Sequence, residues 1–334
     1  MSAIRLGTRA STLATTQSEM VAGLLRSEGL DVNLTTITTH GDTSTASLAA
    51  MGGIGVFASA IRATLLKGEA DIAVHSFKDL PTGRPLGLAI GAVPARADPR
   101  DALVARDGLT LHDLPQEASV GTGSPRRAAQ LLAVRPDLTI VDIRGNVDTR
   151  LGRVKGLGRY AKNGGKEVLD AVVLAASGLA RLGHSGTVTE FLDPSVVLPA
   201  PAQGALAVEC RTADSRHGKL AKALARIDDR RTRLAATAER AVLSHLEAGC
   251  AAPIGALAQL KPVSGSSPQV LTLDVVVATV DGSRIIREQV SVELPAEVDS
   301  ALAAAHTLGV TAAEELLDDG AADVADLKAS GSTR

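Results

Sequence analysis

Basic side chains recur where apolar, strand-like segments of this sequence end. Arg126 and Arg127 follow the segment 121–125, in which Ser124 suits a helix N-cap and Pro125 suits the first helical position. Two cations in a first helical turn oppose the helix dipole by about 0.3–1 kcal/mol each. An anion bound at this helix start would offset that cost, because backbone N–H groups and guanidinium forks would both point toward it.

The same arrangement is expected at three more strand ends. Arg9, Lys78, Arg144 and Arg150 all lie just beyond apolar segments. Ligands of open α/β sheets bind at the carboxyl ends of the strands, so these cations predict a cleft for a ligand with several negative charges. The charge could be phosphate or carboxylate. Planar guanidinium forks suit carboxylates, and no GxxxxGK[ST] motif is present to support a nucleotide.

Asp79 is the single acid in this basic setting. It could serve as a counter-ion for Lys78 or as a helix cap. If it faces the cleft, it could instead move protons on and off a bound nitrogen or carbon, which is the usual task of a positioned carboxylate. His75 could compete for that task, but it ends an apolar strand, where a paired core histidine is the more common case.

The two cysteines differ in their surroundings. Cys210 lies on an apolar strand, which is typical of a buried, reduced thiol, and two cysteines make a disulfide framework implausible. Cys250 follows Gly249 on a loop ahead of Pro253. A loop cysteine without a nearby histidine is not an obvious protease nucleophile, but it is a reasonable point for covalent attachment of a group.

The elements that must position these residues alternate between strand and helix patterns over about the first 200 residues, which predicts parallel sheets with crossover helices. The late strand 205–210 could return the chain to the first unit, so that two crossings make a hinge between lobes. The expected strands are 4–7, 32–38, 70–75, 86–93, 119–121, 139–143, 171–175 and 205–210, and the expected helices are 12–28, 55–67, 125–134 and 147–153.

The pattern changes near residue 229 to a small α+β domain. Alternating apolar and polar residues predict an antiparallel sheet, with Asp281-Gly282 as a two-residue hairpin turn between its last strands. The expected elements are helix 230–246, strands 253–260, 269–280 and 284–293, and helix 298–317. We therefore predict a first α/β lobe at 1–97 and 204–224, a second at 98–203 and a C-terminal domain at 228–330.

Composition limits the possible partners. The chain has 334 residues, three Phe, one Tyr and no Trp, and a net charge of −2. Stacking platforms for bases are therefore scarce and no basic field is present, so we expect no nucleic-acid partner. No apolar run approaches the roughly 18 residues of a membrane span, and we see no signal peptide. We expect a cytoplasmic monomer with no membrane partner and no metal site.

The basic, glycine-rich segment 155–166 lies between a helix and a strand. Its composition is typical of a mobile surface loop, which is the interpretation we favour over a binding role.

Several of these segments closely resemble porphobilinogen deaminases, and the resemblance extends over nearly the whole chain. The specific pieces are Ala73-Val74-His75-Ser76-Phe77-Lys78-Asp79-Leu80-Pro81, Asp98-Pro99-Arg100-Asp101-Ala102, Arg144-Gly145-Asn146-Val147-Asp148-Thr149-Arg150-Leu151, Pro201-Ala202-Gln203-Gly204-Ala205 and Gly249-Cys250. The resemblance implies two lobes like those of periplasmic binding proteins and a third, C-terminal domain. It also implies a dipyrromethane cofactor attached to Cys250, onto which four porphobilinogens are joined head to tail with loss of ammonia, to give hydroxymethylbilane.

The resemblance also assigns roles to individual residues. Asp79 would protonate the leaving amine and assist deprotonation at the new bond. Cofactor-binding positions would be Ser76, Lys78, Asp101, Thr122, Ser124, Arg126, Arg127, Arg144, Gly145 and, covalently, Cys250. Substrate-binding positions would be Arg9, Ser11, Phe57, Arg144, Arg150, Arg181 and Gln203.

This sequence departs from the family pattern at two places. Many relatives carry lysines where Ala50 and Ile54 stand, and the segment 155–166 looks like an insertion of about ten residues. The cations of the insertion, Lys155, Arg159, Lys162 and Lys166, could supply compensating charge.

Two other protein classes share some of these features. A solute-binding protein for small dicarboxylates would have the same lobes and basic cleft, but it would normally be exported and would leave Cys250 without a task. A nucleotide-binding regulator would need a phosphate loop or a DNA-reading module, and the sequence has neither.

Overall fold

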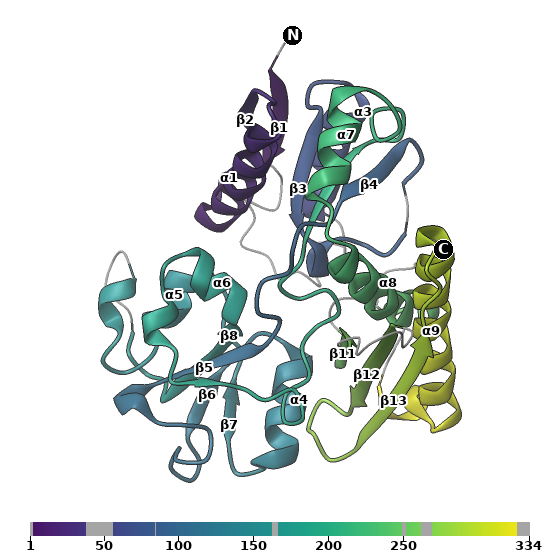
Figure 1. Ribbon diagram of the computed structural model, residues 1–334. Helices are drawn as coiled ribbons and strands as arrows, with labels where there is room; N and C mark the ends of the chain where they lie inside the picture. The colour runs from purple at the N-terminus through teal and green to yellow at the C-terminus, as the bar shows by residue number, and fades with distance from the viewer. Residues whose placement is uncertain are drawn as a thin grey trace.

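The chain folds into two α/β lobes and a C-terminal α+β domain, as expected from its sequence (Figure 1). The computed structural model describes residues 3–37, 56–83, 85–161, 166–248, 252–261 and 269–325, without the side chains of Val56 and Phe57. None of the helices in these ranges is long and apolar enough to cross a membrane.

The first lobe has a five-stranded sheet in the order β2-β1-β3-β10-β4. Four strands share one direction, and β10 runs against both of its neighbours because it enters from the second lobe. The strands are β1 (Ile4–Thr8), β2 (Val32–Thr36), β3 (Ile72–Ser76), β4 (Leu88–Ala92) and β10 (Leu206–Arg211), and the helices are α1 (Thr12–Ser27), α3 (Val56–Leu66) and α7 (Gly218–Ile227).

Alternation along β3 explains how this sheet is covered on both faces. Ile72 and Val74 join the core under α1 and α7, whereas Ala73 joins a separate core with Ile61 and Leu65 of α3. Successive side chains of a strand point to opposite faces, so one short apolar run serves two cores.

The second lobe repeats this plan with the order β7-β6-β8-β5-β9, in which β5 is the reversed strand. Val173 faces the core shared with α4, and Val172 and Leu174 face the core shared with α5 and α6. The elements are β5 (Asp101–Ala105), β6 (Ser119–Gly121), α4 (Pro125–Val134), β7 (Thr139–Val141), α5 (Val147–Leu151), β8 (Ala171–Ala175), α6 (Ala176–Arg181) and β9 (Glu190–Phe191).

Two crossovers connect the lobes and lie against one another. Ala97 N donates to Gly204 O at 3.3 Å, and the Arg96 Nε donates to Gln203 O at 2.7 Å. Gly204 has φ +88° and a Cβ there would meet Ala97 O at 2.6 Å, so both its backbone conformation and the close approach require glycine.

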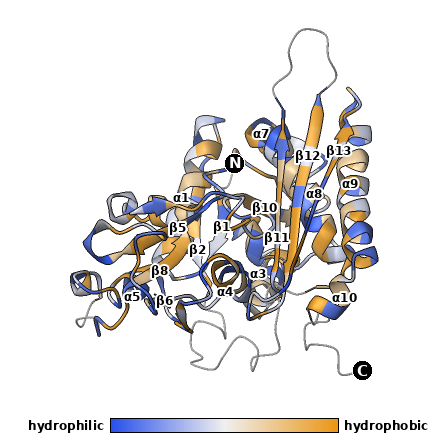
Figure 2. Cartoon of the chain, turned by 90° about the horizontal axis from the view of Figure 1, so that it is seen from below, coloured by the Kyte–Doolittle hydropathy of each residue, from blue (hydrophilic) through white to orange (hydrophobic). Residues whose placement is uncertain are grey.

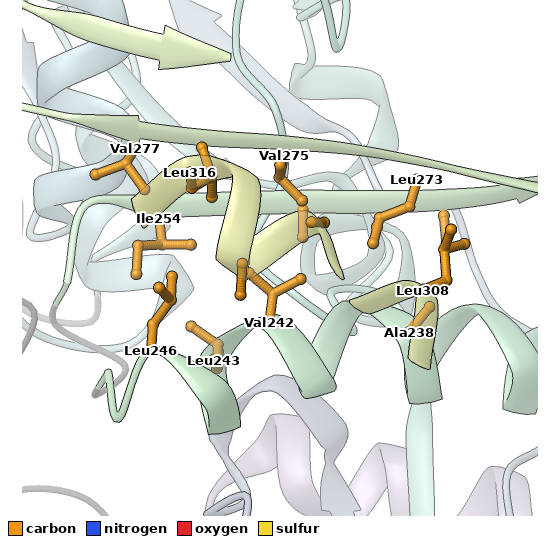
Figure 3. Close-up of a cluster of buried hydrophobic side chains, with 14 of the residues drawn as sticks. Ala238, Val242, Leu243, Leu246, Ile254, Leu273, Val275, Val277, Leu308 and Leu316 are labelled. Atoms are coloured by element: carbon orange, nitrogen blue, oxygen red, sulfur yellow. The ribbon is translucent and has the colours of Figure 1, made fainter. Parts of the chain in front are cut away.

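The C-terminal domain packs two helices on one face of a three-stranded antiparallel sheet, β11-β12-β13 (Figures 2 and 3). Leu273, Val275 and Val277 of the central strand meet Val242 of α8 and Leu316 of α9 in this core. The elements are α8 (Arg230–His245), β11 (Ile254–Leu260), β12 (Val270–Ala278), β13 (Ile285–Glu293), α9 (Val298–Asp318) and α10 (Ala321–Val324).

The other face of this sheet packs against the second lobe. Val276 and Leu257 contact Leu198, and Ala256 N donates to Pro199 O at 3.0 Å. The domain therefore rests on the segment that leads back to the first lobe.

The β12–β13 connection differs from the predicted two-residue turn. Thr279 N donates to Arg284 O at 2.9 Å, so the loop comprises residues 280–283. Gly282 has φ +72° and lies against Ala129 and Ala133 of α4. The prediction was wrong because docking on α4 requires a longer loop than a minimal hairpin.

The sequence also did not predict β5, β9, α6 or α7 as separate elements. The structure describes residues 155–161 and 166 of the basic segment, which include a 3-10 turn, η3 (Gly158–Tyr160). Glu167 accepts from Gly156 N and Gly158 N, at 2.9 and 2.7 Å, and Lys155 pairs with Asp170 at 2.8 Å. Two of the side chains considered as spare cations are thereby engaged locally, since Arg159 also stacks on Tyr160.

Candidate active site

The turn that follows β3 carries Lys78 and Asp79. It is a 3-10 turn, η1 (Phe77–Asp79), and Phe77 N donates to Ala205 O of the returning crossover at 3.0 Å. Phe77 is buried and Asp79 is exposed, so the turn fixes its apolar residue inward and leaves the carboxylate accessible to solvent. Ser76, at the end of β3, is held by Gln17, whose Nε2 donates to Ser76 Oγ at 3.0 Å.

Asp101, at the start of β5, is the centre of a buried cluster. The side chain of Asp101 is 0% exposed, and its Oδ1 accepts from Arg127 Nη2 at 2.7 Å. Its Oδ2 lies 2.8 Å from Arg126 Nη2. Gln203 connects this cluster to the turn, because its Nε2 donates to Asp101 Oδ1 at 2.8 Å and its Oε1 accepts from Lys78 Nζ at 3.2 Å.

This pairing adds to the explanation for the two arginines in the first turn of α4. Asp101, a residue of the chain itself, offsets part of their repulsion with the helix dipole. Each guanidinium also donates to a backbone carbonyl, Arg126 to Leu198 and Arg127 to Val173. Both side chains are therefore rigidly held.

Burial and pairing shift the pKa values in this cluster. Burial pushes the pKa of Asp101 upward, but Arg126 and Arg127 outweigh it and hold the pKa well below its usual range. Burial lowers the pKa of Lys78 to about 8, against the opposing effect of Asp79. The Lys78 ammonium therefore loses its proton at a lower pH than an exposed lysine does.

Arg144 and Arg150 extend the positive region along α5. Arg150 Nε donates to Gly145 O at 2.8 Å, and Gly145 adopts φ +107°. Burial, followed by the nearby charges of Arg127 and Arg144, lowers the pKa of Arg150. Arg144 is exposed and lies 3.2 Å from Asp142.

We call Lys78, Arg126, Arg127, Arg144 and Arg150 the cation cluster. Asp79, Asp101 and Asp142 act electrostatically on members of this cluster, so the five cations outnumber these three acids. Groups with several carboxylates suit the cluster, because guanidinium and ammonium groups pair well with carboxylates. The donor set is therefore suited to a dipyrromethane with acetate and propionate side groups.

Other predicted residues lie around this cluster. Arg181 donates from Nη2 to Gly204 O at 2.7 Å, and burial lowers its pKa. Thr122 is buried and its Oγ1 accepts from Ser124 N at 3.2 Å. Ser124 occupies the N-cap position of α4 without a side-chain cap hydrogen bond.

Arg9 and Ser11 follow β1 at the start of α1. Arg9 is half-buried and the exposed Ser11 caps α1, with Ala14 N donating to Ser11 Oγ at 3.3 Å. Phe57 lies in α3, but its side chain is outside the described part of the structure.

Cys250, Ala50 and Ile54 also lie outside the described residues. Cys210 is buried, and burial raises the pKa of its thiol to about 11, which agrees with the prediction of an inert core cysteine. His75 Nε2 lies 3.3 Å from Glu209, which also pairs with Arg62, so His75 is engaged within the first lobe.

Three residues near the site, Arg96, Glu239 and Arg240, were not predicted from the sequence. Glu239 is fully buried on α8, where its Oε1 accepts from Arg96 Nη1 at 2.6 Å, and Arg240 donates to three carbonyls near Asp79. A signal was present, because Glu239 falls on the apolar face of its helix with Ala235, Ala238 and Val242.

Comparison with known proteins identifies the family. A profile described as "Porphobilinogen deaminase, dipyromethane cofactor binding domain" matches residues 4–219, and one described as "Porphobilinogen deaminase, C-terminal domain" matches residues 233–318. The chain belongs to the porphobilinogen deaminase family. The porphobilinogen deaminase of Cutibacterium acnes is 97% identical over the full length of both chains.

More distant porphobilinogen deaminases agree over nearly the same length. That of Micrococcus luteus is 51% identical over 96% of this chain and 94% of its own. Among solved structures, Apo YehZ from Escherichia coli is similar over 68% of this chain and 86% of its own, with 14% identity and a TM-score of 0.40. The porphobilinogen deaminase family is a family of enzymes of tetrapyrrole synthesis with a dipyrromethane cofactor binding domain, so the interpretation as a solute-binding protein is not supported.

Proposed function

We propose that Asp79 transfers protons in the porphobilinogen deaminase reaction of this chain and that the cation cluster binds the carboxylates of cofactor and substrate. The observation that carries the proposal is an exposed carboxylate beside a cluster of five basic side chains. Substrate pyrroles carry acetate and propionate groups, so the growing chain would bring negative charge to this cluster.

The cofactor would be held by rigid and by accessible groups together. Arg126 and Arg127 are fixed by Asp101, so their remaining donors would meet a ligand without a large loss of side-chain freedom. The proposed cofactor-binding residues are Ser76, Lys78, Asp101, Thr122, Ser124, Arg126, Arg127, Arg144, Gly145 and Cys250. The proposed substrate-binding residues are Arg9, Ser11, Phe57, Arg144, Arg150, Arg181 and Gln203.

Each addition breaks the carbon–nitrogen bond of a porphobilinogen aminomethyl group and forms a carbon–carbon bond to the growing chain. Asp79 would supply a proton to the departing nitrogen, which leaves as ammonia. It would then help to remove the proton from the ring carbon at the new bond, so that the carboxylic acid and the carboxylate alternate. The dipyrromethane supplies the ring carbon to which the first substrate is joined.

Lys78 would support both roles. Its ammonium lies close enough to Asp79 to stabilise the carboxylate, and ligand carboxylates would raise the pKa of Lys78 above the value of about 8 that burial gives it. Binding of an anionic pyrrole would therefore extend the pH range over which Lys78 is charged.

Intact mass spectrometry tests the attachment, and the chain offers a matched control in its second cysteine. We expect active protein to carry the added mass of two pyrrole units, which Cys250→Ala abolishes and Cys210→Ala retains. Cys210 is buried in the first lobe, so its substitution should leave the attachment unaffected. Active protein of bare polypeptide mass, or loss of the addition in Cys210→Ala alone, would contradict the proposal.

A monomeric state and a cytoplasmic location stay predictions from the sequence, as do the domain boundaries. Light scattering after size-exclusion chromatography tests the first, and fractionation of cells tests the second. Limited proteolysis between residues 224 and 228 tests the start of the C-terminal domain.

A further inference from the structure

Arg240 of α8 donates hydrogen bonds to the backbone of the turn that carries Asp79. Its Nη1 donates to Phe77 O at 3.0 Å and to Leu80 O at 2.7 Å, and its Nη2 donates to Pro81 O at 2.7 Å. Its guanidinium carbon also lies 4.4 Å from the centroid of the Phe77 ring. One side chain of the C-terminal domain thus binds residues on both sides of Lys78 and Asp79.

These contacts determine which way the turn faces. Phe77 and Leu80 are buried, and Phe77 N is bound from the other side by Ala205 O. With the carbonyls of Phe77, Leu80 and Pro81 directed at one guanidinium, the two residues between the buried pair are presented away from it. Hydrogen bonds from a charged donor are stronger than those between neutral groups, so the three together constrain the turn strongly.

The position of α8 does not depend on Arg240 alone. The neighbouring Glu239 accepts from Ala202 N, from Ala258 N and from both Nη atoms of Arg96. At the start of the helix, Thr232 Oγ1 accepts from Arg96 N at 3.0 Å. Removal of the Arg240 guanidinium should therefore loosen the turn while α8 stays docked.

We propose that Arg240 is a positioning residue that fixes the turn 77–81 and thereby sets the place of the Asp79 carboxylate relative to the growing pyrrole chain. The inference rests on the proposed role of Asp79. It assigns the C-terminal domain a second task besides carrying the attachment cysteine, because α8 contacts the turn with Arg240 and leads within a few residues to Cys250.

The test compares Arg240→Met, which removes all donors, with Arg240→Lys, which keeps the charge but cannot span three carbonyls. Arg230→Met is the matched control, since Arg230 lies on the same helix and is exposed, with its Nη1 donating to Gln269 Oε1 at 2.9 Å. A displacement of a catalytic group by about 1 Å costs on the order of 100-fold in rate. We expect kcat to fall by about 10- to 100-fold in Arg240→Met and by less in Arg240→Lys, with KM within about twofold.

A double-variant experiment separates positioning from a merely structural role. In the Asp79→Asn background, adding Arg240→Met should change the residual single-turnover rate by less than about twofold, because the group that Arg240 positions is already lost. Intact mass should still show the two-pyrrole addition in Arg240→Met, and Arg230→Met should match the unsubstituted enzyme.

Three results would overturn the inference. These are an unchanged kcat in Arg240→Met, an equal loss of rate with and without Asp79, or loss of the two-pyrrole addition, which would place the role of Arg240 at the attachment instead. If Asp79→Asn by itself keeps full turnover, the proposed function fails, and this outcome is distinct from an active Arg240→Met beside an inactive Asp79→Asn.

Discussion

The surroundings of Asp101 and of Asp79 differ although both carboxylates belong to one site. Asp101 is 0% exposed and is bound by Arg126, Arg127 and Gln203. Asp79 is exposed at the end of a short turn that is held through its backbone. Gln203 and Lys78 connect the two regions within a few hydrogen bonds.

This difference in exposure suits the two carboxylates to different roles, one structural and one catalytic. A buried carboxylate between two guanidiniums stays ionised over the whole physiological range and cannot exchange protons with a ligand. An exposed carboxylate can reach a bound ligand and transfer protons to and from it. One acid therefore organises the cations, and the other is available to act on what they bind.

The largest expected effect is on turnover, in Asp79→Asn. Loss of a general acid–base group lowers the rate by about 100- to 10,000-fold, and the exposed position should keep the free energy of unfolding within about 0.5 kcal/mol of the original. Steady-state kinetics and chemical denaturation measure the two quantities. Full turnover would remove the distinction between the two acids, and a large loss of stability would show that Asp79 is structural.

The second effect is on stability, in Asp101→Asn. The amide leaves two buried guanidiniums without their counter-charge, so we expect the free energy of unfolding to fall by about 3–5 kcal/mol. Asp98→Asn is the matched control, because Asp98 also pairs with an arginine, Arg100, but both side chains are partly exposed. Asp98→Asn should lower the free energy of unfolding by at most about 1 kcal/mol.

The contribution of Asp101 to the free energy of unfolding should also decrease as the pH falls. Its pKa is lower in the folded than in the unfolded chain, so its stabilisation is fully present above the unfolded value near 4 and is lost as pH falls below it. Asp101→Asn should flatten this acid limb of the stability curve. An equally steep limb in the variant would assign the acid sensitivity to other carboxylates.

The smallest expected effect concerns Lys78, which lies between the two acids. In Cys250→Ala protein without attached pyrroles, an amine-reactive reagent should label Lys78 with a rate that rises through pH 8, following its pKa of about 8. Attached carboxylates should raise that pKa by about one, so labelling at pH 8 should be about fivefold slower in the loaded enzyme.

Lys67 is the control for this experiment because it is exposed on the first lobe, away from the described site. Its labelling should be the same in both proteins. Equal labelling of Lys78 with and without attached pyrroles would mean that ligand carboxylates do not lie beside it.

Much of the fold could be predicted because local patterns and burial agree. The strands 119–121 and 171–175 and the helix 125–134 have the expected bounds. Strand β5 was not predicted, although it is as short and as buried as the correctly predicted strand 171–175. The predicted hairpin turn was wrong, and Gly282 in the observed loop contacts a helix far away in the sequence.

The candidate site could be predicted in composition but not in pairing. The positions of Arg126, Arg127 and Asp79 next to strand ends indicated a basic site with one acid, and the family motifs supplied Asp101 and Gln203. That Asp101 pairs with both arginines could not be read from spacing, because the partners come from β5 and α4, which are distant in the sequence. The same holds for Arg240, whose target lies about 160 residues earlier in the chain.

The sequence alone indicated the two-lobed architecture and the cations at the strand ends, and it predicted Cys250 as the attachment point, because periodicity, strand-end position and residue type are local properties. The tertiary structure decided which charges are buried and paired, which carboxylate stays exposed, and which helix holds the turn beside it. These outcomes depend on burial and on contacts between distant segments, which set both the pKa of each group and its freedom to move.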